Sequence, residues 1–310
     1  MTPRGILTAT LLLGAVVSPA QEQIHNGLQQ AIARQMSARH GAVVALDVTS
    51  DRIVAQWNLK VAAQRVTTPG SAVKPFVLME LLQSGKIDAE QRLSCRRPLT
   101  IAGRHMDCSH SPAITNLNAS DAIAYSCNSY FATAARKLSP REMIAVFERA
   151  GFTSRTGLAH DEAVGRITLA PDEPHLQLQA LGDWGFELTP LELLVAYRNL
   201  ALQRLKGGNP TLDPVFSGLE ASVQYGMAHS AAAASLSRIT VAGKTGTVPG
   251  ARTPGTHGFF VGYAPAEKPE IVLVIYLENG RGSDAAAIAA PIFVAYKKAI
   301  QSAPKNGAAQ

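Results

Sequence analysis

The stretch TTPGSAVKPF at residues 67–76 decides how this sequence is interpreted. A Pro-Gly pair breaks the preceding pattern, and apolar residues then recur at helical spacing from Ser71 to Gln83. Ser71 is therefore expected to open a helix. Lys74 follows three positions later, and side chains at i and i+3 lie on one helical face. The stretch thus predicts a hydroxyl and an amine that can meet at a helix start.

This pair could form a nucleophile and its base. A serine hydroxyl is a poor nucleophile alone, and a lysine that has lost its proton through burial or a neighbouring cation can activate it. The helix N-terminus also offers a backbone N–H to an oxyanion. Spacing alone is weak evidence, because residues 302–305 repeat Ser-x-x-Lys in a proline-containing tail that we interpret as surface. An ordinary helix start remains the alternative for Ser71.

A second candidate element is Ser126-Cys127-Asn128, at an expected junction between two helices. Ser126 could relay a proton, and Asn128 could hold the lysine or a substrate amide. Helix capping by the same residue types is the competing interpretation.

The third candidate element is Lys244-Thr245-Gly246-Thr247, on an expected strand. Lys244 can bind a carboxylate, the hydroxyls of Thr245 and Thr247 can extend the hydrogen bonding, and Gly246 lets a substrate backbone approach the strand edge. A protective lysine on an edge strand is the alternative.

The order of expected elements predicts one α+β domain at residues 21–310. Five segments read as strands, two near the start and three near the end, and a long helical stretch separates them: residues 42–48, 53–58, 239–247, 257–264 and 270–278. We expect one sheet assembled from both chain ends, flanked by helices. Its subdomain would comprise residues 21–86 and 236–310, and residues 87–235 would form an inserted helical subdomain.

The first 20 residues resemble an export signal. Arg4 precedes an uncharged run that ends in Ser18-Pro19-Ala20, with small residues where a signal peptidase cuts. Because a bilayer span needs about 20 apolar residues, an uncleaved inner-membrane anchor is the second interpretation. We expect a periplasmic or secreted protein, and contact with a membrane only if the leader is retained.

Charge and cysteine content limit the partners and cofactors. The net charge is +6, but the basic residues are scattered, so we do not expect nucleic acid as a partner. Among the three cysteines, Cys95 and Cys108 flank a Gly-containing segment that could form a hairpin and bring them into a disulfide, whereas Cys127 lies inside the second candidate element. Three buried thiols are the alternative. We expect no metal site and no cofactor, since neither a CxxC pair nor a paired-histidine helix occurs.

The ordered set of three motifs resembles the active site of penicillin-binding proteins and serine β-lactamases. Residues 67–76 resemble the family's Pro-Gly-Ser-x-x-Lys-Pro-Phe, and AYSCNSYF at 124–131 its Ser-Cys-Asn segment. Residues 188–201 are similar to the helix that follows a Thr-Pro in the family. The resemblance covers nearly all of residues 40–300 and implies a β-lactamase/transpeptidase-like fold.

The resemblance also implies roles for the motif residues. Ser71 would attack a D-alanyl-D-alanine or β-lactam carbonyl, while Lys74 takes its proton and Ser126 passes a proton to the leaving group. Asn128 would orient the lysine and substrate amide, and Lys244, with Thr245 and Thr247, would bind the terminal carboxylate. The backbone N–H groups of Ser71 and Thr247 would form the oxyanion hole. The expected partners are peptidoglycan stem peptides and β-lactams, and the oligomeric state is left open.

A D,D-transpeptidase is therefore expected, and hydrolases of the same superfamily compete with it. A β-lactamase must also deacylate, and the Glu-x-x-Leu-Asn loop of class A enzymes does not occur in the sequence. Class D enzymes are similar around Trp184 and Gly185, but carry an apolar residue where Asn128 stands. A D,D-carboxypeptidase is hard to separate from a transpeptidase by sequence, and a β-lactam sensor is the remaining alternative.

Overall fold

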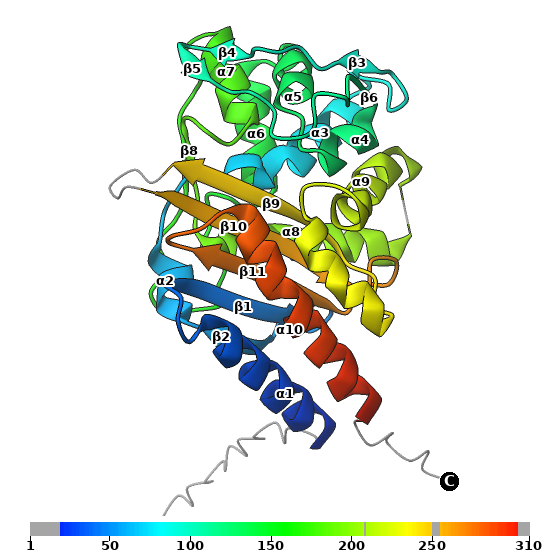
Figure 1. Cartoon of the computed structure of the whole chain (residues 1–310). Coiled ribbons are helices and arrows are strands. Elements are labelled where there is room, and N and C mark those ends of the chain that lie inside the picture. Colours follow the sequence, from blue (N-terminus) through cyan, green and yellow to red (C-terminus); the bar gives the residue numbers. More distant parts are fainter. Residues whose placement is uncertain (1–18, 208, 250–254, 303–310) are drawn as a thin grey trace, which may run out of the picture.

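A five-stranded antiparallel sheet forms the centre of the molecule (Figure 1), in the order β2-β1-β11-β10-β9. The structure is a computed structural model that describes residues 19–207, 209–249 and 255–302. The two strands from the start of the chain lie together and pair through β1 with β11, the nearest of the three strands from the end, so the expected sheet built from both chain ends is confirmed. The strands are β1 (Gly41–Asp47), β2 (Ile53–Trp57), β9 (Ala242–Pro249), β10 (Thr256–Ala264) and β11 (Ile271–Leu277).

The middle strand β11 shows why the sheet lies inside the molecule. All seven of its residues are buried, and successive side chains point to opposite faces. Val272, Val274 and Tyr276 join one hydrophobic cluster, whereas Leu273 and Ile275 join another. A strand covered on both faces needs apolar residues at every position, which explains the uninterrupted apolar run in the sequence.

Helices cover both faces of this sheet. On one face α1 (Pro19–Met36) and α10 (Gly282–Ser302) lie side by side (Figure 1), together with the 3₁₀ segment η3 (His229–Ser237). The other face carries α8 (Pro190–Lys206), which packs on β10 and β11. Helix α8 starts with a reciprocal capping pair, in which Thr189 and Glu192 each satisfy the other's backbone N–H.

The middle of the chain is mainly helical, as expected; residues 93–180 lie together beyond the edge strand β9 (Figure 1), whereas α8 and η3 cover the faces of the sheet. This middle region also contains three short antiparallel pairs, of which sequence reasoning expected only the hairpin between Cys95 and Cys108, because strands of two residues show no periodicity. The pairs are β3 (Leu93–Ser94) with β6 (Asn116–Leu117), β4 (Thr100–Ile101) with β5 (Arg104–His105), and β7 (Arg166–Ile167) with β8 (Phe186–Glu187). Three further helical elements precede this region: α2 (Leu59–Gln64), η1 (Gly70–Val73) and α3 (Lys74–Gln83). Besides α8 and η3, the region itself contains α4 (Ala119–Ala124), α5 (Asn128–Ala135), α6 (Pro140–Arg149), α7 (Glu173–Ala180), η2 (Pro210–Leu212) and α9 (Asp213–Gln224).

The expected helical stretch is interrupted near its end. Helix α9 ends at Gln224, and the chain resumes as the 3₁₀ segment η3. Gly226 lies at the break, where a β-carbon would come within 2.2 Å of the Ala124 carbonyl oxygen. Close approach of two backbone segments therefore ends the helix. A contact between segments this far apart in the chain cannot be predicted from the neighbouring sequence.

Two expectations about the chain's organisation remain predictions. The leader predicted at residues 1–20 lies outside the described residues except for Pro19 and Ala20, which begin α1. The subdomain boundaries at 86/87 and 235/236 also stay a prediction, since α8 packs on the sheet although it lies within the helical range. Within the described ranges, no helix combines the length and apolar character needed to cross a membrane.

Candidate active site

Ser71 lies in the 3₁₀ turn η1, which runs directly into α3. The preceding Gly70 has a φ of 55°, a left-handed conformation that favours glycine. From the opposite side, the buried Tyr197 hydroxyl of α8 donates a hydrogen bond of 2.8 Å to the Ala72 carbonyl oxygen. The turn that carries the nucleophile candidate is thus anchored at both neighbouring residues.

Strand β9 packs directly on this turn. A β-carbon at Gly246 would lie 2.3 Å from the Pro69 carbonyl oxygen, so the glycine makes room for the protein's own backbone. Sequence reasoning had assigned that room to a substrate backbone. A β-carbon at Gly70 would lie 3.3 Å from the Thr247 amide nitrogen. This proximity supports the expected oxyanion pair of Ser71 and Thr247 N–H groups, which stays a prediction.

The Ser126 hydroxyl lies between two buried lysines. Lys244 Nζ donates to Ser126 Oγ at 2.8 Å, and Lys74 Nζ lies 3.3 Å from the same oxygen. Ser126 has a φ of 53°, which is uncommon for a residue with a side chain and is found at functional sites. The structure therefore brings Lys74, Ser126 and Lys244 from three distant segments into one hydrogen-bonded group.

The contacts of Lys74 leave one position on its nitrogen for a proton. Its Nζ donates to the Ser126 carbonyl oxygen at 2.8 Å and to Asn128 Oδ1 at 2.6 Å, and both of these oxygens only accept. A neutral amine has two hydrogens and one lone pair. With both hydrogens used in this way, the lone pair can receive a proton from a hydroxyl, and the Ser126 hydroxyl lies 3.3 Å from the same nitrogen.

Burial favours the neutral form of both lysines. Loss of hydration lowers the pKa of Lys74 to about 8, although the nearby Cys127 and Cys108 sulfurs act in the opposite direction. The pKa of Lys244 is also lowered well below its usual value, first by burial and then by the positive charge of Lys74. Lys74 can therefore act as a base close to neutral pH, as the pairing with Ser71 requires.

The rate of acylation by a penicillin should consequently rise with pH until Lys74 is neutral. Its pKa is lowered to about 8, so the base form accumulates as the pH increases through that value. About two pH units below the pKa only about 1% of Lys74 is neutral, and acylation should be about 100-fold slower than on the plateau. Stopped-flow measurement of the second-order acylation constant across this range tests the prediction. A flat profile would contradict the base role.

Asn128 is held by a segment that sequence reasoning missed. Its Nδ2 donates to the Met106 carbonyl oxygen at 2.9 Å, just after the β4–β5 hairpin. This contact orients the amide so that its oxygen faces Lys74. Any residue has a carbonyl group, so no signal in the sequence could have identified Met106.

The two threonines of the third motif follow Lys244 along β9. Thr245 is nearly buried, whereas Thr247 is exposed and its Oγ1 accepts a hydrogen bond of 2.9 Å from the Gly282 N–H at the start of α10. Their contact with a substrate carboxylate stays a prediction.

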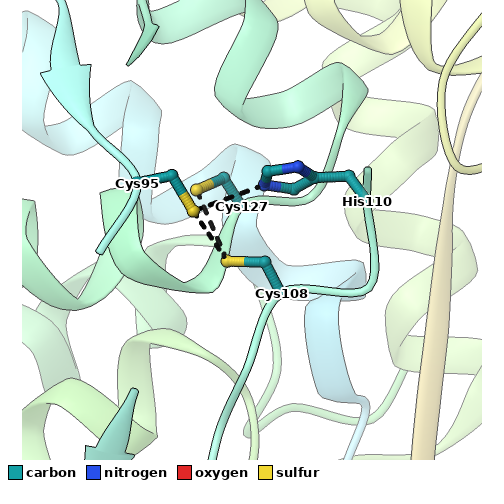
Figure 2. Close-up of side chains that lie close together, drawn as sticks. All are labelled: Cys95, Cys108, His110 and Cys127. Atoms are coloured by element: carbon teal, nitrogen blue, oxygen red, sulfur yellow. Dashed lines mark hydrogen bonds between the residues drawn. The ribbon is translucent and has the colours of Figure 1, made fainter. Parts of the chain in front are cut away.

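The predicted Cys95–Cys108 disulfide is not formed in this structure, where all three cysteines are free. The hairpin expected between them is present as β4 and β5. The Cys95 and Cys108 sulfurs lie 3.5 Å apart (Figure 2), well beyond the ~2.0 Å of a disulfide bond. Cys127, which sequence reasoning had set apart as a motif residue, lies with its sulfur 3.6 Å from that of Cys108.

Comparison with known proteins identifies the family. The family described as "Penicillin binding protein transpeptidase domain" matches residues 32–296. The chain belongs to this family. As a transpeptidase domain, it is 26% identical over 355 residues to "Peptidoglycan D,D-transpeptidase MrdA" of Acinetobacter baumannii, covering 86% of this chain and 52% of that protein. It is 24% identical over 261 residues to "Peptidoglycan D,D-transpeptidase FtsI" of Buchnera aphidicola, covering 75% of this chain and 44% of the relative.

The fold of this transpeptidase domain is also that of a solved structure. Pseudomonas aeruginosa PBP2 in complex with WCK 5153 superposes with a TM-score of 0.74 at 22% identity, covering 88% of this chain and 76% of that chain. This similarity establishes the α+β fold of β-lactamases and transpeptidases. The chain spans about half the length of the curated relatives it matches.

Proposed function

We propose that this chain is a serine D,D-transpeptidase that acts on D-alanyl-D-alanine peptides of peptidoglycan through an acyl-enzyme on Ser71. The observation that carries the proposal is the buried group of Lys74, Ser126 and Lys244 next to the turn that bears Ser71. Membership of the transpeptidase domain family and the names of the two relatives support the substrate class.

In the proposed acylation step Lys74 acts as the base for Ser71. Ser71 Oγ bonds to the carbonyl carbon of the penultimate D-alanine, and its proton moves to the Lys74 lone pair. The carbonyl π electrons move to oxygen, where the N–H groups of Ser71 and Thr247 would stabilise the negative charge. Lys244 would bind the substrate's terminal carboxylate, whose negative charge favours the protonated amine that burial alone disfavours.

Ser126 then offers a path for the proton to the leaving group. The C–N bond to the terminal D-alanine breaks, and the amine takes the Ser126 hydroxyl proton while Ser126 regains one from Lys74. The 3.3 Å separation of Lys74 Nζ and Ser126 Oγ suits this relay. An amine of a second stem peptide attacks the ester in the reverse sense and frees Ser71.

The proposal includes export from the cytoplasm. The substrate lies in the cell wall, and the predicted leader at residues 1–20 would direct the chain there. We therefore propose a periplasmic or secreted enzyme whose partners are stem peptides and β-lactams, with an inner-membrane anchor as the alternative if the leader is retained.

Intact-protein mass spectrometry after incubation with a penicillin tests the proposed activity. We expect an adduct of one penicillin mass that persists for hours and maps to the peptide containing Ser71. Rapid release of penicilloate without a lasting adduct would instead identify a β-lactamase, and no reaction would reject the acyl-enzyme.

A second assay separates transpeptidation from simple hydrolysis. The enzyme is given a D-alanyl-D-alanine stem peptide and a labelled D-amino acid as acceptor. Incorporation of the label supports transpeptidation, whereas release of D-alanine without incorporation would identify a D,D-carboxypeptidase.

A further inference from the structure

A cluster of four potential metal ligands lies beside the second catalytic motif. The side chains of Cys95, Cys108, His110 and Cys127 converge (Figure 2), and their ligand atoms all lie within 4.8 Å of one another. Cys108, His110 and Cys127 are at most 6% exposed, and Cys95 is half-buried. Three sulfurs and one imidazole gathered in the interior form a complete set of ligands for one ion.

From this cluster we propose that the chain binds one Zn²⁺ ion through Cys95, Cys108, His110 and Cys127. Zinc prefers thiolate and imidazole ligands in a tetrahedral arrangement, with Zn–S distances of about 2.3 Å, which places neighbouring sulfurs about 3.8 Å apart. The observed separations are 3.5 Å for Cys95–Cys108 and 3.6 Å for Cys108–Cys127. The Cys95 Sγ to His110 Nε2 distance is 3.7 Å, which a tetrahedron of these bond lengths also accommodates.

The surroundings of the cluster suit bound thiolates. The backbone N–H of Ser129 points to Cys108 Sγ and that of Tyr130 to Cys127 Sγ, each at 3.4 Å. Amide donors of this kind stabilise negative sulfur and hold the ligand in place. Both come from the first turn of α5, whose positive dipole end favours the same charge.

The imidazole is oriented by contacts on its far side. His110 Nδ1 lies 3.1 Å from the Ser111 carbonyl oxygen, an acceptor, and 3.0 Å from Arg97 Nη2, a donor. Zinc binding through Nε2 places the proton on Nδ1, which would then donate to Ser111, while Arg97 Nη2 keeps its hydrogen bond of 2.8 Å to the His110 carbonyl oxygen. Nε2 is the nitrogen that faces the Cys95 sulfur, at 3.7 Å.

The ion would connect the segments that position the catalytic groups. Cys127 lies between Ser126 and Asn128, and Cys108 directly follows Asp107, next to the carbonyl that holds Asn128. Binding all three sulfurs to one atom would fix the turn that presents the Ser126 hydroxyl and the Asn128 amide. We assign the ion a positioning role, since its four ligands are distinct from Lys74, Ser126 and Lys244, whose side chains form the hydrogen-bonded group of the active site.

This site was not expected from the sequence because metal-ligand searches rely on short spacings. The four ligands are separated by 12, 1 and 16 intervening residues, a pattern without a CxxC pair. A Cys95–Cys108 disulfide and a zinc site are mutually exclusive uses of the same sulfurs. The two can therefore be separated by experiment.

The test uses the full chain, freed of metal by a chelator and reduced, then titrated with Zn²⁺ alone against a chromophoric competitor. We expect one Zn²⁺ per chain. Cys95→Ser and His110→Ala should weaken zinc binding by at least about 10- to 100-fold, the loss typical even for residues that only support ligands. His160→Ala changes a histidine whose side chain is 98% exposed and should retain full affinity.

Co²⁺ provides a readout of geometry. Bound in place of Zn²⁺, it should show thiolate charge-transfer absorption and the intense d–d bands of a tetrahedral site. These bands should weaken in Cys95→Ser, which retains three ligands and a folded chain. Absence of stoichiometric binding in the wild type, or equal affinity in the variants and the control, would overturn the proposal. Finding one free thiol and a Cys95–Cys108 linkage after denaturing alkylation of the protein as purified would overturn it too.

The positioning role has its own test, which rests on the proposed acyl-enzyme activity. Removal of zinc should slow acylation by a penicillin by about tenfold or more, and Zn²⁺ but not Mg²⁺ should restore it. Unchanged acylation by a protein that does bind one Zn²⁺ would reject the positioning role and leave the metal site standing. If no acylation occurs with or without zinc, the proposed function is rejected. The zinc site is not affected by that result, because zinc binding is measured by titration and not by activity.

Discussion

Replacing Ser71 with alanine is expected to abolish covalent labelling by a penicillin completely while the protein remains folded. The change removes one oxygen from a residue in a turn that its neighbours anchor, through Gly70 packing on β9 and the Tyr197 bond to Ala72. The loss is therefore chemical, because the hydroxyl oxygen forms the ester bond. Intact-protein mass spectrometry measures the labelling, and circular dichroism with thermal melting measures the fold.

The chain supplies a matched control for this variant. Ser302 begins the second Ser-x-x-Lys sequence, and its exposed hydroxyl bonds to the Lys298 carbonyl oxygen of α10. Ser302→Ala should label like the wild type. Labelling that survives Ser71→Ala, at the same mass and rate, would assign the nucleophile to another residue.

The sheet could be predicted because its strands carry a local signal. Alternation and apolar runs of five or more residues identified β1, β2, β10 and β11 within a few positions. We could predict that strands from the two chain ends pair in one sheet because apolar strands must be covered by other parts of the chain. By contrast, the break at Gly226 and the pairs β3–β6 and β7–β8 depend on contacts between separate segments, which leave no periodic pattern in the sequence.

The active site could be predicted in its residue types but not in its contacts. The spacing of Ser71 and Lys74 is local, whereas the meeting of Ser126 with Lys244 was inferred only from the order of three motifs. That Lys74 donates to a backbone oxygen of Ser126 follows from the left-handed conformation of that residue. A backbone conformation of this kind in a non-glycine residue is set by tertiary packing and has no sequence signature.

The cysteine cluster shows a different limit. Cys127 was set aside because it lies inside a catalytic motif, and Cys95 and Cys108 were paired because a hairpin joins them. The hairpin exists, but it delivers both sulfurs to Cys127 and His110 as well. Nearness along the chain suggested a pair of bonded sulfurs, whereas the fold brings together four potential metal ligands.

Replacing Lys74 with methionine should reduce the rate of acylation by about 10²- to 10⁴-fold, the usual contribution of a positioned general base. Methionine has a similar length, so the buried space stays filled. The Ser126 carbonyl oxygen and Asn128 Oδ1 each lose a donor, but the cost of burying an amine that is fully enclosed is removed as well. We therefore expect a melting temperature only a few degrees from that of the wild type.

The pH profile of this variant distinguishes a base from a residue that only packs. In the wild type acylation should rise with pH up to about 8, where Lys74 becomes neutral, and in Lys74→Met that limb should disappear from the residual rate. Lys60→Met, which changes an exposed lysine of α2, should keep both rate and limb. If Lys74→Met retained the limb with a rate within tenfold of the wild type, the base would have to be another group. Lys244 would then be the candidate, because it also contacts Ser126 and its pKa is also lowered by burial.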